Sequence, residues 1–183
     1  MNIRNALKKI RSKKIDYIIA SSGNSKKTYN KFFTEKELIN SLNDNLISFT
    51  NLLEQYLAVY NCKKTSIIAI SSIAANKAID APITYSISKA ALNHYCKIKS
   101  KELAKYKISL NIISPGNILM EKNNWGRKMK AKPLEVKKYI KKNVPLNSFI
   151  HPENIFNMCN LIFNDSNKVF TGSNFIIDGG QSI

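Results

Sequence analysis

Tyr85 and Lys89 stand four residues apart in the run Tyr85-Ser86-Ile87-Ser88-Lys89, and Ser72 lies thirteen residues upstream of Tyr85. Positions i and i+4 share one face of a helix, so the phenol and the ammonium are expected side by side. A nearby cation favours the phenolate, which predicts a lowered pKa for Tyr85. A tyrosine tuned in this way can act as a general acid or base, and a hydroxyl at Ser72 can hold a substrate carbonyl oxygen.

The elements that must position these groups alternate between compact apolar runs and amphipathic segments. Strands are predicted over Ile15–Ala20, Ser66–Ile70, Ile108–Ile113 and Phe175–Ile177. Helices are predicted from the Thr34 capping box to about Tyr60, from Thr84 to Tyr106 and from Pro152 onward, with a short one over Asn5–Ser12. This alternation predicts a parallel sheet with helices on both faces.

Four segments resemble the short-chain dehydrogenase/reductase family, and they occur in that family's order: Ile67–Ser72, Tyr85–Ala91, Leu110–Gly116 and Thr171–Gly180. The resemblance spans Ile15 to Ile183 and implies one Rossmann-like α/β domain over 1–183, a three-layer αβα sandwich. It also implies that the chain corresponds to the C-terminal two-thirds of the family domain, N-terminally truncated, with the first two to three βα units absent. The Lys-rich segment 117–150 is then expected to be a substrate lid.

The resemblance assigns catalytic roles to four residues. Tyr85 becomes the proton donor to a carbonyl, Lys89 its pKa-lowering cation and a ligand of the nicotinamide ribose, and Ser72 the residue that holds the carbonyl oxygen. Ser71 competes with Ser72, but its side chain should point the opposite way along the strand, and the spacing selects Ser72. Asn45 is expected to hold a water in a proton relay, although Asn43 competes with it and a solvated surface role is the simpler alternative.

The cofactor implied by the resemblance is NAD or NADP. Gly23, Pro115, Gly116 and Ile118, together with Tyr85 and Lys89, are the expected cofactor-binding residues. The sequence departs from the family pattern at Met120, where a threonine is usual, and in the turn after Ala20. It contains no glycine-rich G-x-G-x-x-G turn to bind a pyrophosphate, so only the nicotinamide half of the site is expected, with weakened affinity.

The formal charge of +17 could indicate nucleic-acid binding, but the basic residues are spread along a Lys-, Asn- and Ile-rich chain without a recognition motif. Specific nucleic-acid binding is therefore not expected. No apolar run suits a membrane span or a secretion signal, and the three scattered cysteines suit a reducing cytoplasm.

Three functions remain open at this level. The first is an oxidoreductase that passes hydride between nicotinamide and a small carbonyl or alcohol substrate. The second is a catalytically silent relative that serves as a subunit or remnant, and the third is a basic anion- or nucleic-acid-binding module. A homo-oligomer, dimer or tetramer, is expected from the habit of the family. Neither the substrate nor the choice between NAD and NADP can be read from these residues.

Overall fold

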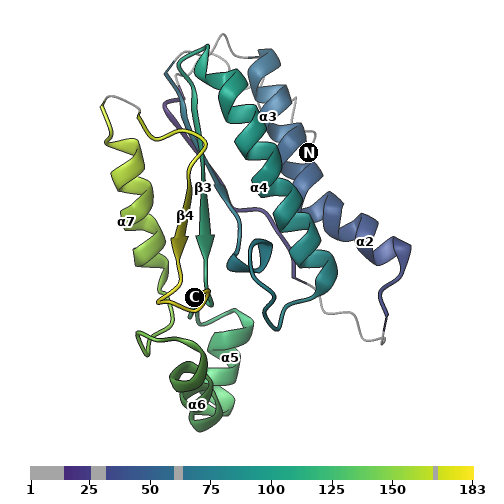
Figure 1. Cartoon of the computed structure of the whole chain (residues 1–183), viewed down its shortest axis with the longest axis vertical. Coiled ribbons are helices and arrows are strands. Elements are labelled where there is room, and N and C mark those ends of the chain that lie inside the picture. Colours follow the sequence, from purple (N-terminus) through teal and green to yellow (C-terminus); the bar gives the residue numbers. More distant parts are fainter. Residues whose placement is uncertain (1–14, 26–31, 60–63, 167–168) are drawn as a thin grey trace.

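The computed structural model describes residues 15–25, 32–59, 64–166 and 169–183, and within them four parallel strands form one sheet (Figure 1). Their order in the sheet is their order in the chain: β1 Tyr17–Ala20, β2 Ser66–Ile70, β3 Ser109–Pro115 and β4 Asn174–Ile177. The four predicted strands are confirmed to within two residues. The predicted helix over Asn5–Ser12 lies outside the described residues.

Helices cover both faces of this sheet, which confirms the predicted three-layer fold. The helices are α2 Glu35–Leu42, the π-helix η1 Asn43–Ile47, α3 Ser48–Val59, α4 Ile83–Ala104, α5 Asn124–Ala131, α6 Pro133–Asn143 and α7 Pro152–Phe163, with a 3-10 turn, η2, at Ile73–Ala75. Figure 1 shows α3 and α4 on one side of the sheet and α7 on the other. The helix predicted from Thr34 to about Tyr60 is thus α2, η1 and α3 in succession.

The core consists of two layers, one on each face of the sheet, because successive side chains of β2 and β3 point to opposite faces. Ile67 and Leu110 pack with Phe49, Leu53 and Leu92 from the α3–α4 side, whereas Ile68 and Ile113 pack with α7. All four of these strand side chains are buried. Each contributes about 1.5–3 kcal/mol by leaving water, and a strand covered on both faces needs a continuous apolar run rather than alternation.

Local sequence explains where α2 begins. Thr34 Oγ1 accepts the Glu37 backbone N–H, and the Glu37 carboxylate accepts the Thr34 backbone N–H at 2.7 Å. This reciprocal arrangement is the predicted capping box, and it satisfies two backbone donors that a helix start leaves free.

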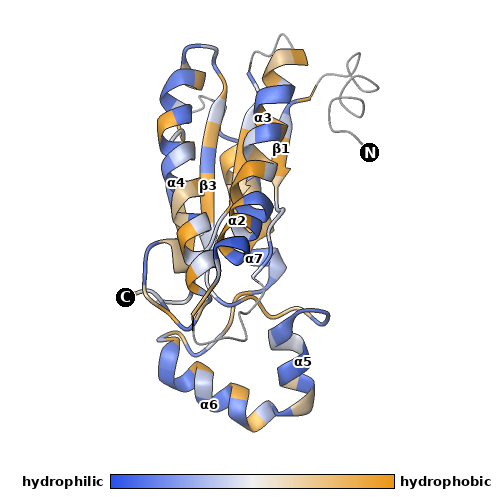
Figure 2. Ribbon diagram, turned by 90° about the vertical axis from the view of Figure 1, so that its right-hand side faces the viewer, coloured by the Kyte–Doolittle hydropathy of each residue, from blue (hydrophilic) through white to orange (hydrophobic). Residues whose placement is uncertain are grey.

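Helices α5 and α6 lie beyond the carboxyl ends of the strands, below the sheet in Figures 1 and 2. The ends of their segment are joined, since Leu119 N–H donates to Ile150 O at 2.8 Å and Ile150 N–H donates to Asn117 O at 3.1 Å. Trp125 packs on Tyr139 and Phe149 with ring centroids 4.7 and 4.8 Å away. Two helices, α5 and α6, therefore occupy more than half of the segment 117–150. Among the described residues, no helix has the length and apolar character required to cross a bilayer.

Candidate active site

A cavity of about 200 Å³ opens at the carboxyl ends of β1, β2 and β3. It is lined by residues 21–25 after β1, residues 70–72 at the end of β2, Tyr85 and Lys89 of α4, and Pro115, Gly116 and Ile118 after β3. Ligands of open parallel α/β sheets bind at this edge. The structure therefore brings seven of the eight predicted site residues to one cavity, and the eighth, Asn45, lies directly behind Gly23.

Ser72 sits where β2 gives way to a 3-10 turn. Its Oγ accepts the Ala74 backbone N–H at 3.2 Å and thereby caps η2. Because that bond uses a lone pair, the hydroxyl proton remains available for the side-chain hydrogen bond that Ser72 makes with Tyr85. Ser71, the alternative, is buried, and its Oγ has no hydrogen-bond partner among the described residues.

The environment of Tyr85 corrects one expectation. Burial raises the pKa of Tyr85 above its usual value, and only the hydrogen bond with Ser72 acts to lower it. Lys89 does not lower it, because the i+4 spacing places its Nζ 5.8 Å from the ring centroid of Tyr85 while Nζ donates to Ile70 O at 2.9 Å. The phenol therefore keeps its proton at neutral pH, which suits a proton donor.

Lys89 is almost completely buried, which is unusual for a lysine. It is only 3% exposed, and burial lowers the pKa of its ammonium to about 8. A buried lysine with one carbonyl as its hydrogen-bond partner is energetically costly. Buried charged groups of this kind occur most often at functional sites, where catalysis or binding needs them although they lower the stability of the fold.

Asn45, not Asn43, faces the site. It is 1% exposed within η1, whereas Asn43 is exposed. The Asn45 amide binds the backbone of Asn24 in both directions, accepting its N–H at 3.0 Å and donating to its carbonyl at 3.0 Å, and it also donates to Ser41 O at 2.9 Å. Asn45 therefore fastens the β1 loop to the helix, and its part in a water relay stays a prediction.

Gly23 is held between Asn45 and Lys89. A Cβ at this position would lie 2.7 Å from Asn45 Oδ1 and 3.0 Å from Lys89 Nζ. A side chain at this position would therefore crowd both groups, and glycine leaves room for them.

Replacement of Asn45 by Ala is expected to lower the free energy of unfolding by about 1–3 kcal/mol, because the Asn24 backbone groups lose their buried partner. Urea unfolding measures this change. Asn43→Ala is the matched control in the same helical turn and should be nearly neutral, since its side chain is exposed. Equal effects of the two substitutions would contradict the assignment.

The turn after β3 is braced from the C-terminal segment. Gly116 N–H donates to Ile177 O at 2.8 Å, and Asn117 N–H donates to the Gln181 amide oxygen at 3.0 Å. A Cβ at Gly116 would lie 2.8 Å from Asp178 Cβ, so this contact also requires glycine. Gln181 was missed in the sequence, as were the polar residues Ser21, Ser22, Asn24 and Ser25 that line the cavity. Their signal was a serine-rich run directly after a predicted strand.

Comparison with known proteins gives consistent matches. A family model described as enoyl-(acyl carrier protein) reductase matches residues 2–182. The chain is similar to an acetoacetyl-CoA reductase of Synechocystis sp. (strain ATCC 27184 / PCC 6803 / Kazusa), with 27% identity over 139 residues that cover 75% of this chain and 55% of the relative. The chain thus spans about half of that relative's length.

Solved structures show the same fold. A 4-hydroxyisoleucine dehydrogenase mutant complexed with NADH and succinate superimposes with a TM-score of 0.85 at 26% identity, covering 98% of this chain and 74% of the other. An oxidoreductase of the short-chain dehydrogenase/reductase family from Burkholderia thailandensis gives a TM-score of 0.83 at 24% identity, covering 98% and 68%.

Proposed function

Because this chain belongs to the short-chain dehydrogenase/reductase family, we propose that it carries the catalytic centre of an NAD(P)-dependent oxidoreductase acting on a carbonyl or alcohol group. The observation that supports this most strongly is the meeting of Ser72, Tyr85 and Lys89 at one cavity at the carboxyl edge of the sheet. These groups come from two separate parts of the chain, the turn that follows β2 and the helix α4.

In the proposed reaction Tyr85 gives its proton to the carbonyl oxygen as that oxygen becomes an alcohol. Ser72, whose hydroxyl lies within hydrogen-bonding reach of Tyr85, holds the same oxygen and orients it. The hydride that reduces the carbonyl carbon is supplied by the bound nicotinamide. The phenolate left on Tyr85 keeps its hydrogen bond with Ser72 and regains a proton from solvent.

The residues present fit the nicotinamide–ribose end of a dinucleotide. Lys89 offers donors for ribose hydroxyls, and the absence of a Cβ at Gly23 leaves the space beside its ammonium open. Pro115, Gly116 and Ile118 supply the opposite wall. The fit is confined to this half, since the sequence holds no glycine-rich turn for the pyrophosphate.

We assign the α5–α6 segment as the substrate lid of a single domain. Its ends join at Asn117 and Ile150, and Ile118 lies in the cavity wall. The helices around Asn45 and Tyr85 carry exposed isoleucines such as Ile47 and Ile87, which supports the expected homo-oligomer.

A second candidate is a subunit that needs a complementing polypeptide. Tyr17 and Ile19 of the edge strand β1 are 53% and 49% exposed, an unusual state for a parallel strand. This candidate predicts poor solubility of the chain alone. A monodisperse protein with tight cofactor binding would contradict it.

Purified protein tested with NADH and with NADPH against a panel of ketones and 3-oxoacyl thioesters is expected to oxidise at least one cofactor in a substrate-dependent manner. Calorimetry with the cofactor alone provides the independent control. If there is neither binding nor turnover at saturating cofactor, this chain does not act as an oxidoreductase on its own.

A further inference from the structure

The α5–α6 segment carries a concentration of positive charge that the rest of the chain does not match. Residues 117–150 contain nine Lys or Arg and two Glu, whereas the other 149 residues contain twenty basic and ten acidic residues. A Lys-rich composition alone would spread both kinds evenly. The segment therefore has about twice the density of basic residues found in the rest of the chain, with no matching increase in acidic residues.

Both of its acids are already occupied. Glu121 pairs with Lys130, and Glu135 pairs with Lys132 at 2.9 Å. In the part of the chain that the structure describes, the remaining cations of α5 and α6 have no acidic partner. They are Arg127, Lys128, Lys137, Lys138, Lys141 and Lys142, and all six are exposed.

On α6 these cations repel one another. Lys137 and Lys141, and likewise Lys138 and Lys142, stand at the i,i+4 spacing, where like charges destabilise a helix. Lysines in the last turn of a helix interact favourably with the helix dipole, which offsets the repulsion for Lys141 and Lys142. Lys137 and Lys138 lie one turn earlier and gain less from the dipole. A bound polyanion would relieve this repulsion.

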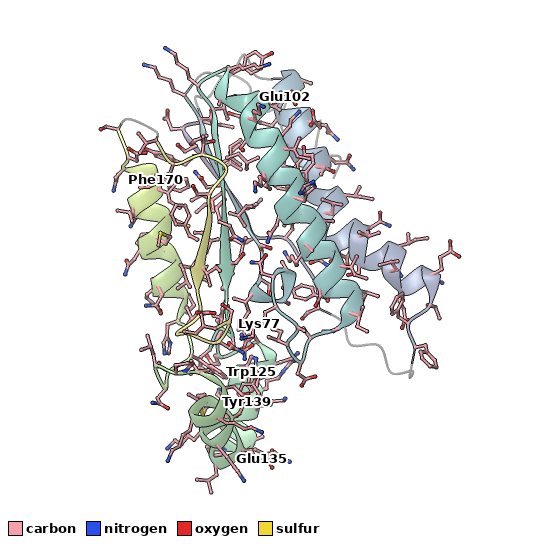
Figure 3. All side chains as sticks on the ribbon, viewed as in Figure 1. Lys77, Glu102, Trp125, Glu135, Tyr139 and Phe170 are labelled. Carbon is pink, nitrogen blue, oxygen red and sulfur yellow. The ribbon has the colours of Figure 1, made fainter. Side chains whose placement is uncertain are left out.

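The charged helix is connected to the cavity wall. The Asn117 side-chain amide and the Tyr139 hydroxyl of α6 lie 3.4 Å apart, and Asn117 is flanked by the lining residues Gly116 and Ile118. Figure 3 shows Trp125, Tyr139 and Glu135 at the same end of the molecule, beyond the carboxyl ends of the strands. The charged helix α6 therefore lies next to the part of the cavity wall that Gly116 and Ile118 form.

We propose that the α5–α6 segment binds the phosphate-bearing end of a long-armed acyl substrate, an acyl thioester of the coenzyme A type, while the acyl carbonyl enters the cavity. This inference deepens the proposed oxidoreductase function and rests on it. A neutral ketone would gain nothing from six exposed cations, whereas phosphates would meet them directly.

Trp125 provides the test, because it is the only tryptophan in the sequence and lies within α5, with Lys128 Nζ 4.8 Å from its ring centroid. Titration with coenzyme A is expected to change Trp125 fluorescence saturably, with an apparent Kd that weakens as salt is added. Pantetheine, which has the arm without phosphates, should produce no saturable change.

The triple variant Lys137→Gln/Lys138→Gln/Lys141→Gln is expected to weaken coenzyme A binding by about tenfold. Its matched control is Lys97→Gln/Lys101→Gln/Lys105→Gln, which removes the same charge from exposed positions near the far end of α4. The control should bind coenzyme A as the unmodified protein does.

The proposal is overturned if coenzyme A leaves Trp125 unchanged, if both triple variants lose affinity equally, or if only phosphatidylglycerol vesicles produce the response. Measurements of turnover distinguish a failure of the proposed coenzyme A site from a failure of the proposed oxidoreductase function. A chain that reduces a pantetheine thioester and its coenzyme A counterpart equally well keeps the oxidoreductase function and loses this inference. A chain that binds coenzyme A yet reduces neither thioester keeps the anion site and loses the reaction.

Discussion

Tyr85→Phe is expected to lower kcat/KM for carbonyl reduction by about 10²–10⁴-fold. The substitution removes the phenolic proton that is proposed to reach the carbonyl oxygen, while the ring stays in place on α4. Burial holds the pKa of Tyr85 above its usual value, so the unmodified phenol is protonated throughout the neutral range. The reduction rate should accordingly be nearly independent of pH there, as far as Tyr85 is concerned.

Tyr95→Phe is the matched control for this experiment. Tyr95 lies on the same helix, but its hydroxyl donates to Glu54 at 3.0 Å, and it is not among the cavity residues. Steady-state kinetics of both variants, with calorimetric cofactor binding, separate lost chemistry from lost structure. Full activity in Tyr85→Phe would remove this residue from the reaction.

Lys89→Met is expected to abolish activity and yet to stabilise the fold at pH 7. The ammonium is buried and its pKa is lowered to about 8, so the folded state binds fewer protons than the unfolded state between about pH 8 and 10.5. Stability should therefore rise with pH across that window, and the burial penalty is present in full below pH 8. A depression of this size corresponds to roughly 3 kcal/mol, an upper limit for the gain, because the substitution also loses the hydrogen bond to Ile70 O.

Chemical denaturation between pH 7 and 10.5 measures this effect, and Lys99→Met is the opposite-sign control. Burial acts to lower the pKa of Lys99, but hydrogen bonds with Glu54 and Glu102 raise it overall. Lys99 therefore stabilises the fold below its unfolded pKa, and that contribution is lost as pH rises through the folded value. A Lys89→Met variant that is less stable than the unmodified protein at pH 7 would contradict this reasoning.

The sequence was sufficient to predict the elements and most of the cavity, because local patterns determine both. The strands were predicted from continuous apolar runs, and the start of α2 was predicted from its capping box. The spacing to Tyr85 selected Ser72 over Ser71. The family motifs then placed Pro115 and Gly116 at the end of a strand and Tyr85 and Lys89 on a helix that packs beside it. The topology of the parallel sheet brings the two pairs together.

Features that depend on tertiary contacts could not be predicted. The burial of Asn45 follows from the π-helix η1, a local change of helical pitch that no propensity in Asn43–Ile47 announces. The direction of the Tyr85 pKa follows from where Lys89 Nζ actually points, toward Ile70 O, and from how deeply the phenol is buried. The bracing of the β3 turn by Gln181 joins positions sixty-four residues apart.

Transfer of deuterium from the nicotinamide C4 of labelled NADH or NADPH to the carbonyl carbon of a reduced product tests the proposed function most directly. Mass spectrometry of the alcohol is predicted to find one deuterium at that carbon with the unmodified protein, and about a hundredfold less labelled product, or lower still, in the same time with Tyr85→Phe. Label that stays on the cofactor while it is demonstrably bound, or that reaches the product equally well in both proteins, would show that Ser72, Tyr85 and Lys89 do not form a working catalytic site.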